Sequence, residues 1–387
     1  MSEARTKRVR WAWSSVALAG VLAACEPGAG EAPPPMAPVA PLPPYVARPG
    51  PPPAPPPPAR PVFPPPKPTY ISLARTGDKA LDALLVEADR AYGADDFVRA
   101  WNAYKAAGRT APKRAAPIVG AARSAIAQET PSLNFSAARG NLKIDAALNN
   151  LRRAAKLEPD FGPTYAEMGR ALLLLARAPE AIEPRERAVL LLPHEPEAHS
   201  ALGVALLATG RGGEAIAALA HAVELDPGSS PRHGNLGTVL FMRGRVEEAI
   251  KEYEAEVQLD DSDARAHSDL GTALLAKNDF IGAMRELNRA IALDPKRATF
   301  RSNIGYALQL QGKVTEAIAS YREAIRLDDK LASAWINLAT ALSKDPRTRA
   351  EARAALEKAR ALDPTDPRVR ANVEELDSLE KHPPGKH

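Results

Sequence analysis

Four polar residues recur in this chain at regular intervals of 34 positions: Asn235, Asp269, Asn303 and Asn337. We call this series the polar ladder. Three of its members carry a carboxamide, which offers both a hydrogen-bond donor and an acceptor. Such a group matches the C=O and N–H of an extended peptide without reading the peptide's side chains, so the ladder predicts binding rather than catalysis. The alternative is that asparagine is simply common at this position of a repeated helix.

Histidine and cysteine supply most metal ligands and many nucleophiles, but here they suggest no such site. The only cysteine is Cys25, and the seven histidines lack metal-ligand spacing. His199, His233 and His267 also recur every 34 residues, as a ladder of ligands would. Trp335 fills the same position later in the chain, which favours a packing role. No GxSxG, P-loop or HExxH motif occurs, so we expect no catalytic residue, metal or other cofactor.

The elements that position these residues repeat with the same period. A large apolar residue followed by a small one recurs at Met168-Gly169, Leu202-Gly203, Leu236-Gly237, Leu270-Gly271, Ile304-Gly305 and Leu338-Ala339. A small residue lets two helix backbones approach closely. A second set of residues falls where a left-handed conformation must turn the chain after the first helix: Gly210, Gly244, Asn278 and Gly312. The sequence therefore predicts a run of helical hairpins.

This pattern resembles the tetratricopeptide repeat family over residues 80–381. The resemblance implies an all-α fold, a right-handed superhelix (α-solenoid) of eight repeats within residues 80–366. A polar capping helix at 367–381 and a tail at 382–387 are expected to follow, since a solenoid must shield its last apolar face. The second repeat is longer than the period, so residues 128–141 are expected to form a protruding loop.

The same resemblance assigns a role to the polar ladder. In related repeat proteins its position faces the concave groove of the superhelix, where asparagines hold an extended peptide. Val86, Glu167 and Ala201 interrupt the series in earlier repeats, so a ligand is expected in the C-terminal half.

Residues 1–24 read as a secretory signal, in which basic residues precede an apolar run at 11–24. That run is shorter than the about 20 residues that span a bilayer. The Leu-Ala-Ala-Cys motif ending at Cys25 resembles a bacterial lipobox, which implies that Cys25 becomes the lipidated first residue of the mature protein. Glu26 follows, rather than the aspartate that often retains lipoproteins in the inner membrane. An outer-membrane anchor with the repeats facing the periplasm is therefore expected; the alternative is an ordinary signal peptide with a chance cysteine.

A proline-rich linker is expected at residues 25–70, since 21 of the 38 prolines lie between Pro27 and Pro68. Such a segment favours a disordered, extended tether of polyproline II type. It is either a passive spacer, a docking strip for an aromatic-lined groove, or a thread through the cell wall. The formal net charge of +4 comes largely from the first ten residues, so nucleic acid is not an expected partner.

Together these features predict a lipid-anchored scaffold that binds envelope proteins or extended peptides and takes no small-molecule substrate. It is similar to the tetratricopeptide lipoproteins that pilot secretin assembly for pili or secretion systems, and to those that recruit peptidoglycan hydrolases. Two alternatives remain. One is a passive structural tether between membrane and wall. The other is an enzyme such as a repeat-regulated glycosyl transferase, although the repeats leave no segment for its catalytic domain.

Overall fold

The computed structural model describes residues 70–129 and 140–381. Every regular element in these ranges is a helix and none is a strand, which confirms the all-α fold. Cys25 and its motif, the linker up to residue 69, most of the expected loop at 128–141 and the C-terminal tail lie outside the described residues. These parts therefore stay predictions.

The chain divides into two compact units, residues 1–218 and 219–387, and the same helical hairpin builds both. The helices of the first unit are α2 (Lys79–Gly93), α3 (Phe97–Thr110), α4 (Ala115–Glu129), α5 (Leu142–Leu157), α6 (Gly162–Leu174), α7 (Ala178–Leu191) and α8 (Pro196–Ala208). The next helix, α9 (Gly212–Leu225), crosses the division. Those of the second unit are α10 (Ser230–Met242), α11 (Val246–Leu259), α12 (Ala264–Ala276), α13 (Phe280–Leu293), α14 (Ala298–Leu310), α15 (Val314–Leu327), α16 (Ala332–Leu342), the short 3₁₀ helix η3 (Pro346–Thr348), α17 (Arg349–Leu362) and α18 (Pro367–Lys381).

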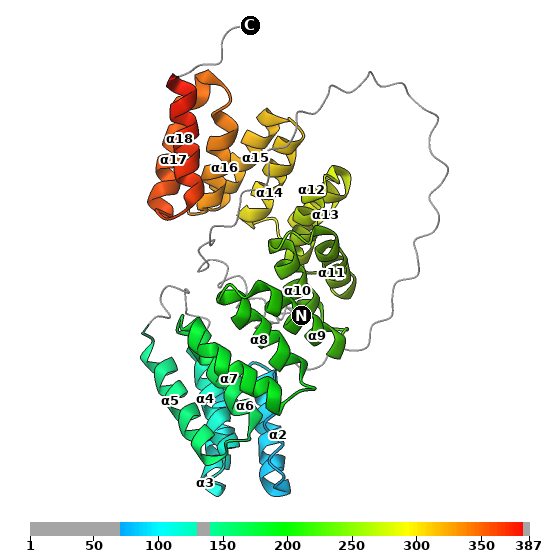
Figure 1. Ribbon diagram of the computed structural model, residues 1–387, viewed down its shortest axis with the longest axis vertical. Coiled ribbons are helices and arrows are strands. Elements are labelled where there is room, and N and C mark those ends of the chain that lie inside the picture. Colours follow the sequence, from blue (N-terminus) through cyan, green and yellow to red (C-terminus); the bar gives the residue numbers. More distant parts are fainter. Residues whose placement is uncertain (1–69, 130–139, 382–387) are drawn as a thin grey trace, which may run out of the picture. The chain divides into compact units, whose positions relative to one another are not determined.

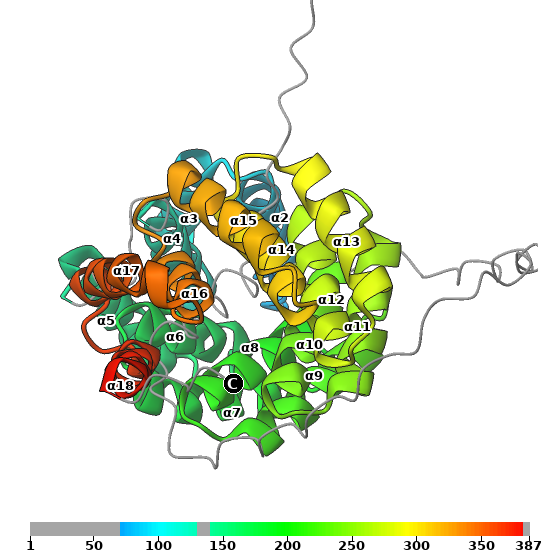
Figure 2. The ribbon, with the colours of Figure 1, turned by 90° about the horizontal axis from the view of Figure 1, so that it is seen from above.

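Neighbouring helices pack in pairs, such as α14 with α15 and α16 with α17 (Figures 1 and 2). The first helix of a pair also contacts the first helix of the next pair, as α12 does with both α10 and α14. Among the described helices, successive second helices such as α11 and α13 make no comparable contact. The first helices therefore line one side of each unit, which we call its inner face.

The small residues of the repeat lie where the two helices of a pair touch, as the sequence predicted. A Cβ atom on Gly305 of α14 would lie 2.6 Å from the ring of Tyr321 on α15. On Gly237 of α10 it would lie 2.9 Å from the ring of Tyr253 on α11. Both distances are shorter than real Cβ contacts, so glycine here lets a bulky side chain of the second helix pack directly on the first.

The turns after α8, α10, α12 and α14 adopt the predicted left-handed conformation. The φ angles are +77° at Gly210, +73° at Gly244, +63° at Asn278 and +76° at Gly312. Glycine and asparagine tolerate this conformation better than other residues. The prediction of these four turn positions is confirmed.

Candidate peptide-binding face

The polar ladder has one residue on each of α10, α12, α14 and α16, the first helices that line the inner face of the second unit. The amide Nδ2 of Asn303 donates to Ser268 Oγ at 3.0 Å, and that of Asn337 donates to Ser302 Oγ at 3.3 Å. Each amide thus bridges its own helix to the preceding first helix. Asn303 and Asn337 are half-buried, and no hydrogen bond to their Oδ1 atoms occurs within the described residues. These carbonyl oxygens are held in place and available to a ligand.

Asp269 departs from this pattern. The residue at the matching distance on the preceding first helix is Gly234, which has no hydroxyl to pair with. The Asp269 side chain is half-buried and takes part in no hydrogen bond or ion pair of the described chain. Burial raises the pKa of this carboxyl to about 7; the positive charge of Arg265 opposes the shift and the negative charge of Asp263 adds to it. Near neutral pH the Asp269 side chain is therefore partly protonated: its carboxylate form only accepts hydrogen bonds, and its carboxylic acid form also donates one.

Asn235, the first member of the ladder, was expected to face the groove, but its side chain is buried. Its side chain is only 2% exposed, and its Nδ2 has no hydrogen-bond partner. It therefore contributes no accessible amide, and the members that reach the inner face are Asp269, Asn303 and Asn337.

The sequence analysis missed an acidic residue behind the ladder. Glu256 of α11 stands where other second helices have alanine, and it is 1% exposed. Burial raises the pKa of its carboxyl well above the usual range, and the charge of Asp269 adds to the rise. The sequence does carry a sign of it: alanine recurs every 34 residues at Ala222, Ala290 and Ala324, and Glu256 interrupts this series.

The inner face of the first unit is already occupied, by residues 70–76 of the same chain. Asp89 of α2 accepts a hydrogen bond from the Leu73 backbone N–H at 2.8 Å, and Arg123 of α4 donates to the Ile71 carbonyl at 2.7 Å. Asp89 and Arg123 also form a buried ion pair at 2.5 Å. Side chains of the first helices thus hold the backbone of a non-helical segment, which bends at Leu73. Nothing in the repeat pattern predicted this, because these residues directly follow the proline-rich linker.

Aromatic residues enclose this buried ion pair. The Arg123 guanidinium lies 4.3 Å from the ring centroid of Tyr92 and 5.1 Å from that of Tyr104. The Tyr104 hydroxyl donates to Asp89 Oδ1 at 2.6 Å. Burial raises the pKa of Tyr104, whereas the charge of Arg123 lowers it. The arrangement satisfies a charge that would otherwise be costly to bury.

The histidines of the 34-residue series have a structural role, as predicted. Nε2 of His199, His233 and His267 lies 2.9, 3.0 and 3.2 Å from the carbonyl oxygen six residues earlier. Trp335 Nε1 donates to the equivalent carbonyl, of Asp329, at 2.9 Å. The shared position therefore supplies an N–H that ties each first helix to the turn before it. In the described part of the chain, no cluster of acidic, histidine and cysteine side chains is arranged to hold a metal ion.

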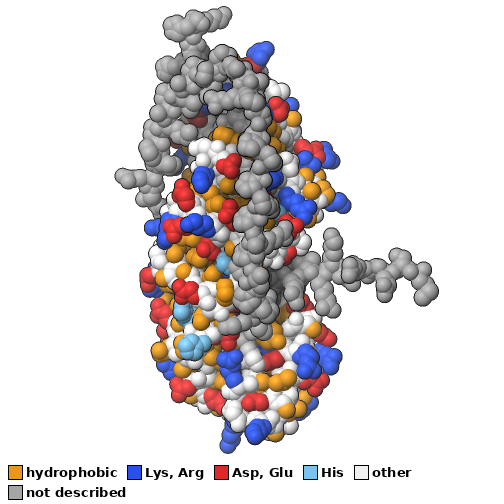
Figure 3. Space-filling view, turned by 90° about the vertical axis from the view of Figure 1, so that its right-hand side faces the viewer, with side chains coloured by type: hydrophobic (Ala, Val, Ile, Leu, Met, Phe, Trp, Pro, Cys, Tyr) orange, Lys and Arg blue, Asp and Glu red, His pale blue; other side chains and the backbone are white. Residues whose placement is uncertain are grey.

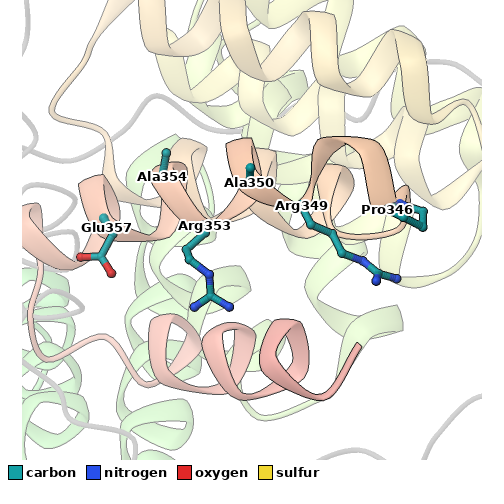
Figure 4. A pocket seen from close by; sticks show the side chains of 6 residues that line it. All are labelled: Pro346, Arg349, Ala350, Arg353, Ala354 and Glu357. Carbon is teal, nitrogen blue, oxygen red and sulfur yellow. The ribbon is translucent and has the colours of Figure 1, made fainter. Parts of the chain in front are cut away.

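A shallow hollow beside the last helix pair has no evident chemistry. It is lined by Pro346, Arg349, Ala350, Arg353, Ala354 and Glu357 (Figure 4). Arg349 Nη1 donates to the Leu379 carbonyl at 2.8 Å, and Arg353 pairs with Asp377 at 2.6 Å. Its two arginines thus hold α18 against α17.

The described residues on the face drawn in Figure 3 show no single-sign charge field. On the face drawn in Figure 3, acidic and basic side chains alternate with apolar ones. Of the helices that the structure describes, none combines the length and the apolar character needed to cross a membrane.

Comparison with known proteins agrees with this architecture. Two family models, both described as Tetratricopeptide repeat, match the chain, one at residues 167–230, 268–332 and 311–367 and the other at 206–255. No curated protein matches its sequence.

Similar helical hairpins occur in solved structures. The APC/C hetero-tetramer Cut9-Hcn1 aligns with a TM-score of 0.54 and 17% identity, over 79% of this chain and 57% of that chain. This likeness concerns the fold alone, and this chain spans less than two thirds of that one. The human IFIT1 dimer with PPP-AAAA gives a TM-score of 0.49 and 19% identity, over 74% of this chain and 69% of that chain. The Pseudomonas aeruginosa pilF structure gives a TM-score of 0.45 and 18% identity, over 55% of this chain and 97% of that chain.

Proposed function

Because this chain is a tetratricopeptide repeat protein, we propose that it is a scaffold that holds extended segments of partner proteins on the inner face of its second unit. The observation that carries this proposal is the fixed orientation of Asn303 and Asn337. Each amide donates an N–H to a serine of the preceding first helix, and its carbonyl oxygen remains available to accept from a ligand. Two such acceptors on successive first helices suit the N–H groups of an extended backbone.

The arrangement in the first unit supports this reading. There, side chains of α2 and α4 already hold the main chain of residues 70–76 through its N–H and C=O groups. The same fold therefore holds a non-helical segment by its main chain in one unit and presents polar groups that can hold a main chain in the other.

The proposal includes a membrane anchor. A lipid on Cys25 would hold the repeats at the periplasmic side of the outer membrane, and the proline-rich linker would set their reach. The Leu-Ala-Ala-Cys motif supports this part. The partners would then be envelope proteins, such as subunits of a secretin or pilus assembly or peptidoglycan hydrolases.

Photo-crosslinking in intact cells tests the scaffold. Tyr306 lies on α14 three positions after Asn303 and is 44% exposed, so a photoreactive phenylalanine analogue at this position faces a bound segment. The control carries the same analogue at Ile281 of α13, a second helix, where the side chain is 85% exposed. We expect a discrete crosslinked partner from position 306 only. Equal yields from both positions, or none from either, would instead favour the passive tether.

A further inference from the structure

Residues 70–76 lie on the first unit as a bound peptide would. Ile71 is 6% exposed and belongs to an apolar cluster with Ala166 of α6, Ala188 of α7, Leu192 directly after α7, and Ala198 of α8. Leu73 is fully buried in the core formed by α2 to α7. Arg75 pairs with Glu195, the residue before α8, at 3.1 Å. The segment therefore buries the side chains of Ile71 and Leu73, and between them Ser72 donates to Asp89 at 2.7 Å. The backbone bends at Leu73, whose carbonyl accepts from the Arg75 N–H at 2.8 Å.

The main chain of the segment is held by side chains rather than by another strand. Asp89 accepts from the Leu73 N–H, Arg123 donates to the Ile71 carbonyl, and Arg114 donates to the Thr76 carbonyl at 2.7 Å. A surface that grips a backbone in this way accepts any sequence whose apolar side chains fit the two buried positions. Selectivity then comes from those two positions and from Glu195.

The connection to α2 passes through Gly77, where the backbone conformation favours glycine. Gly77 has a φ of +79°, and a Cβ there would find no atom within 4 Å. Asp78 then caps α2, because its Oδ1 accepts from the N–H groups of Ala80 and Leu81. The helix thus has its own N-cap, although Thr76 also bonds to Asp82.

We propose that this surface is a second peptide-binding site, filled in cis by residues 70–76 and open to a partner segment of the same pattern. That pattern is a peptide with large apolar residues two positions apart, a bend at the second of them, and a basic residue two positions further on. Residues 70–76 compete with a partner for this surface. A partner can bind only molecules in which the segment has left the surface, so its apparent affinity falls in proportion to the fraction of such molecules. This site is independent of the polar ladder, so either proposal can fail without the other.

The test uses the full chain and a fluorescent peptide with the sequence of residues 69–77. In the variant Ile71→Asp with Leu73→Asp, two buried apolar anchors become charged, so the segment leaves its seat. We expect this variant to bind the peptide at least ten-fold more tightly than the wild type in fluorescence anisotropy. The control peptide, with aspartate at both anchor positions, should not bind. Adding Glu195→Lys to the variant should weaken binding of the original peptide several-fold.

Two results would overturn the proposal. One is equal peptide binding by wild type and unseated variant; the other is a variant that keeps its helical circular dichroism yet does not bind the peptide. If the variant loses helicity, the proposal is tested with a second variant of the chain instead. It carries a specific protease site after Gly77, so that cleavage leaves residues 70–77 held only by contacts. Exchange with labelled peptide would support the site, and no exchange over days would make the segment a permanent part of the fold.

Discussion

The carboxyl group of Glu256 lies directly against the backbone of Gly234. A Cβ atom at position 234 would lie 2.3 Å from Glu256 Oε1, where no side chain fits. The positions that match Gly234 on α12 and α14 hold Ser268 and Ser302, and those that match Glu256 on α13 and α15 hold alanine. This one helix pair has therefore replaced a serine and an alanine with a glycine and a glutamate. The two changes are sterically coupled, because the Glu256 carboxyl occupies the space that a side chain at position 234 would need.

The coupling predicts a double-mutant result. Gly234→Ser alone forces its side chain onto the Glu256 carboxyl and should destabilise α10 and α11 by about 1–3 kcal/mol through overpacking. Adding Glu256→Ala restores the combination of the neighbouring repeats and should recover most of that loss. Hydrogen exchange of α10 and α11 measures both effects. Additive losses in the two single variants and the double variant would mean that the residues are not coupled.

The carboxyl of Asp269 predicts a pH-dependent stability. Its pKa in the folded protein is raised from 3.8 to about 7, so the folded state binds more protons than the unfolded state between these values. The stabilisation is fully present below about pH 4 and is lost as pH rises to about 7, by at most about 4 kcal/mol. Glu256, whose pKa is also raised, acts in the same direction. Urea unfolding of the second unit should show this decline.

Asp269→Asn is the matched control for that profile, because it restores the amide of the other ladder positions. The variant should retain the decline due to Glu256 and lose the part due to Asp269. Parallel profiles for wild type and variant would assign the pH dependence to other groups.

Where a repeated position decides the structure, the fold could be predicted from the sequence. The small residues at Gly237 and Gly305 and the left-handed turn at Asn278 follow from the geometry of a helical hairpin, which is the same in every repeat. Where a single position departs from the repeat, the structure could not be predicted from the sequence. Glu256 and Gly234 each look like isolated exceptions along the chain, and only their contact explains them.

The same reasoning explains two other misses. The register places Asn235 on the inner side of its helix, but burial depends on neighbours that the register does not specify. Residues 70–76 carry no repeat signal at all, so their place against Asp89 and Arg123 depends on contacts between distant parts of the chain. Periodicity identifies which face a residue is on, and it does not identify what covers that face.

Overpacking between the helices of one pair should have a local effect. Gly271→Leu places a side chain where a Cβ alone would lie 2.8 Å from Leu287 Cγ and 3.3 Å from the Ala283 carbonyl oxygen. The expected cost is about 1–3 kcal/mol. Each pair contacts mainly its neighbours, so hydrogen-exchange protection should fall chiefly in α12, α13 and the adjoining helices. A uniform loss over all described helices would contradict this.

The anchor proposal is tested at Cys25. A serine has no thiol to accept the thioether-linked lipid, so Cys25→Ser should abolish labelling by a fatty-acid probe. The protein should then leave the membrane fraction or accumulate as an unprocessed precursor. Lipid label on the variant, together with sedimentation in the outer membrane, would rule out the lipobox. A matched control, Glu26→Gln, should keep both label and location.

The last prediction concerns the ladder amides themselves. Asn303→Ala with Asn337→Ala removes two fixed acceptors, each worth about 0.5–1.5 kcal/mol net. Partner binding should weaken by about 1–3 kcal/mol, a factor of about 5 to 150. Fluorescence anisotropy or calorimetry with the partner segment recovered by crosslinking measures the change. The fold should also lose a little stability, because both amides donate to serines of the preceding helix.

That stability loss calls for a control with the same missing bonds. Ser268→Ala with Ser302→Ala removes the same two hydrogen bonds to the serine hydroxyls but leaves both amides in place; both serines are 3% exposed, so a ligand does not touch them. If the amides contact the ligand, affinity falls in the asparagine variant and stays within about two-fold in the serine variant, while stability falls similarly in both. Equal affinity losses in the two variants would mean that the amides act only by joining α12, α14 and α16. Unchanged affinity in both would remove the ladder from the binding site.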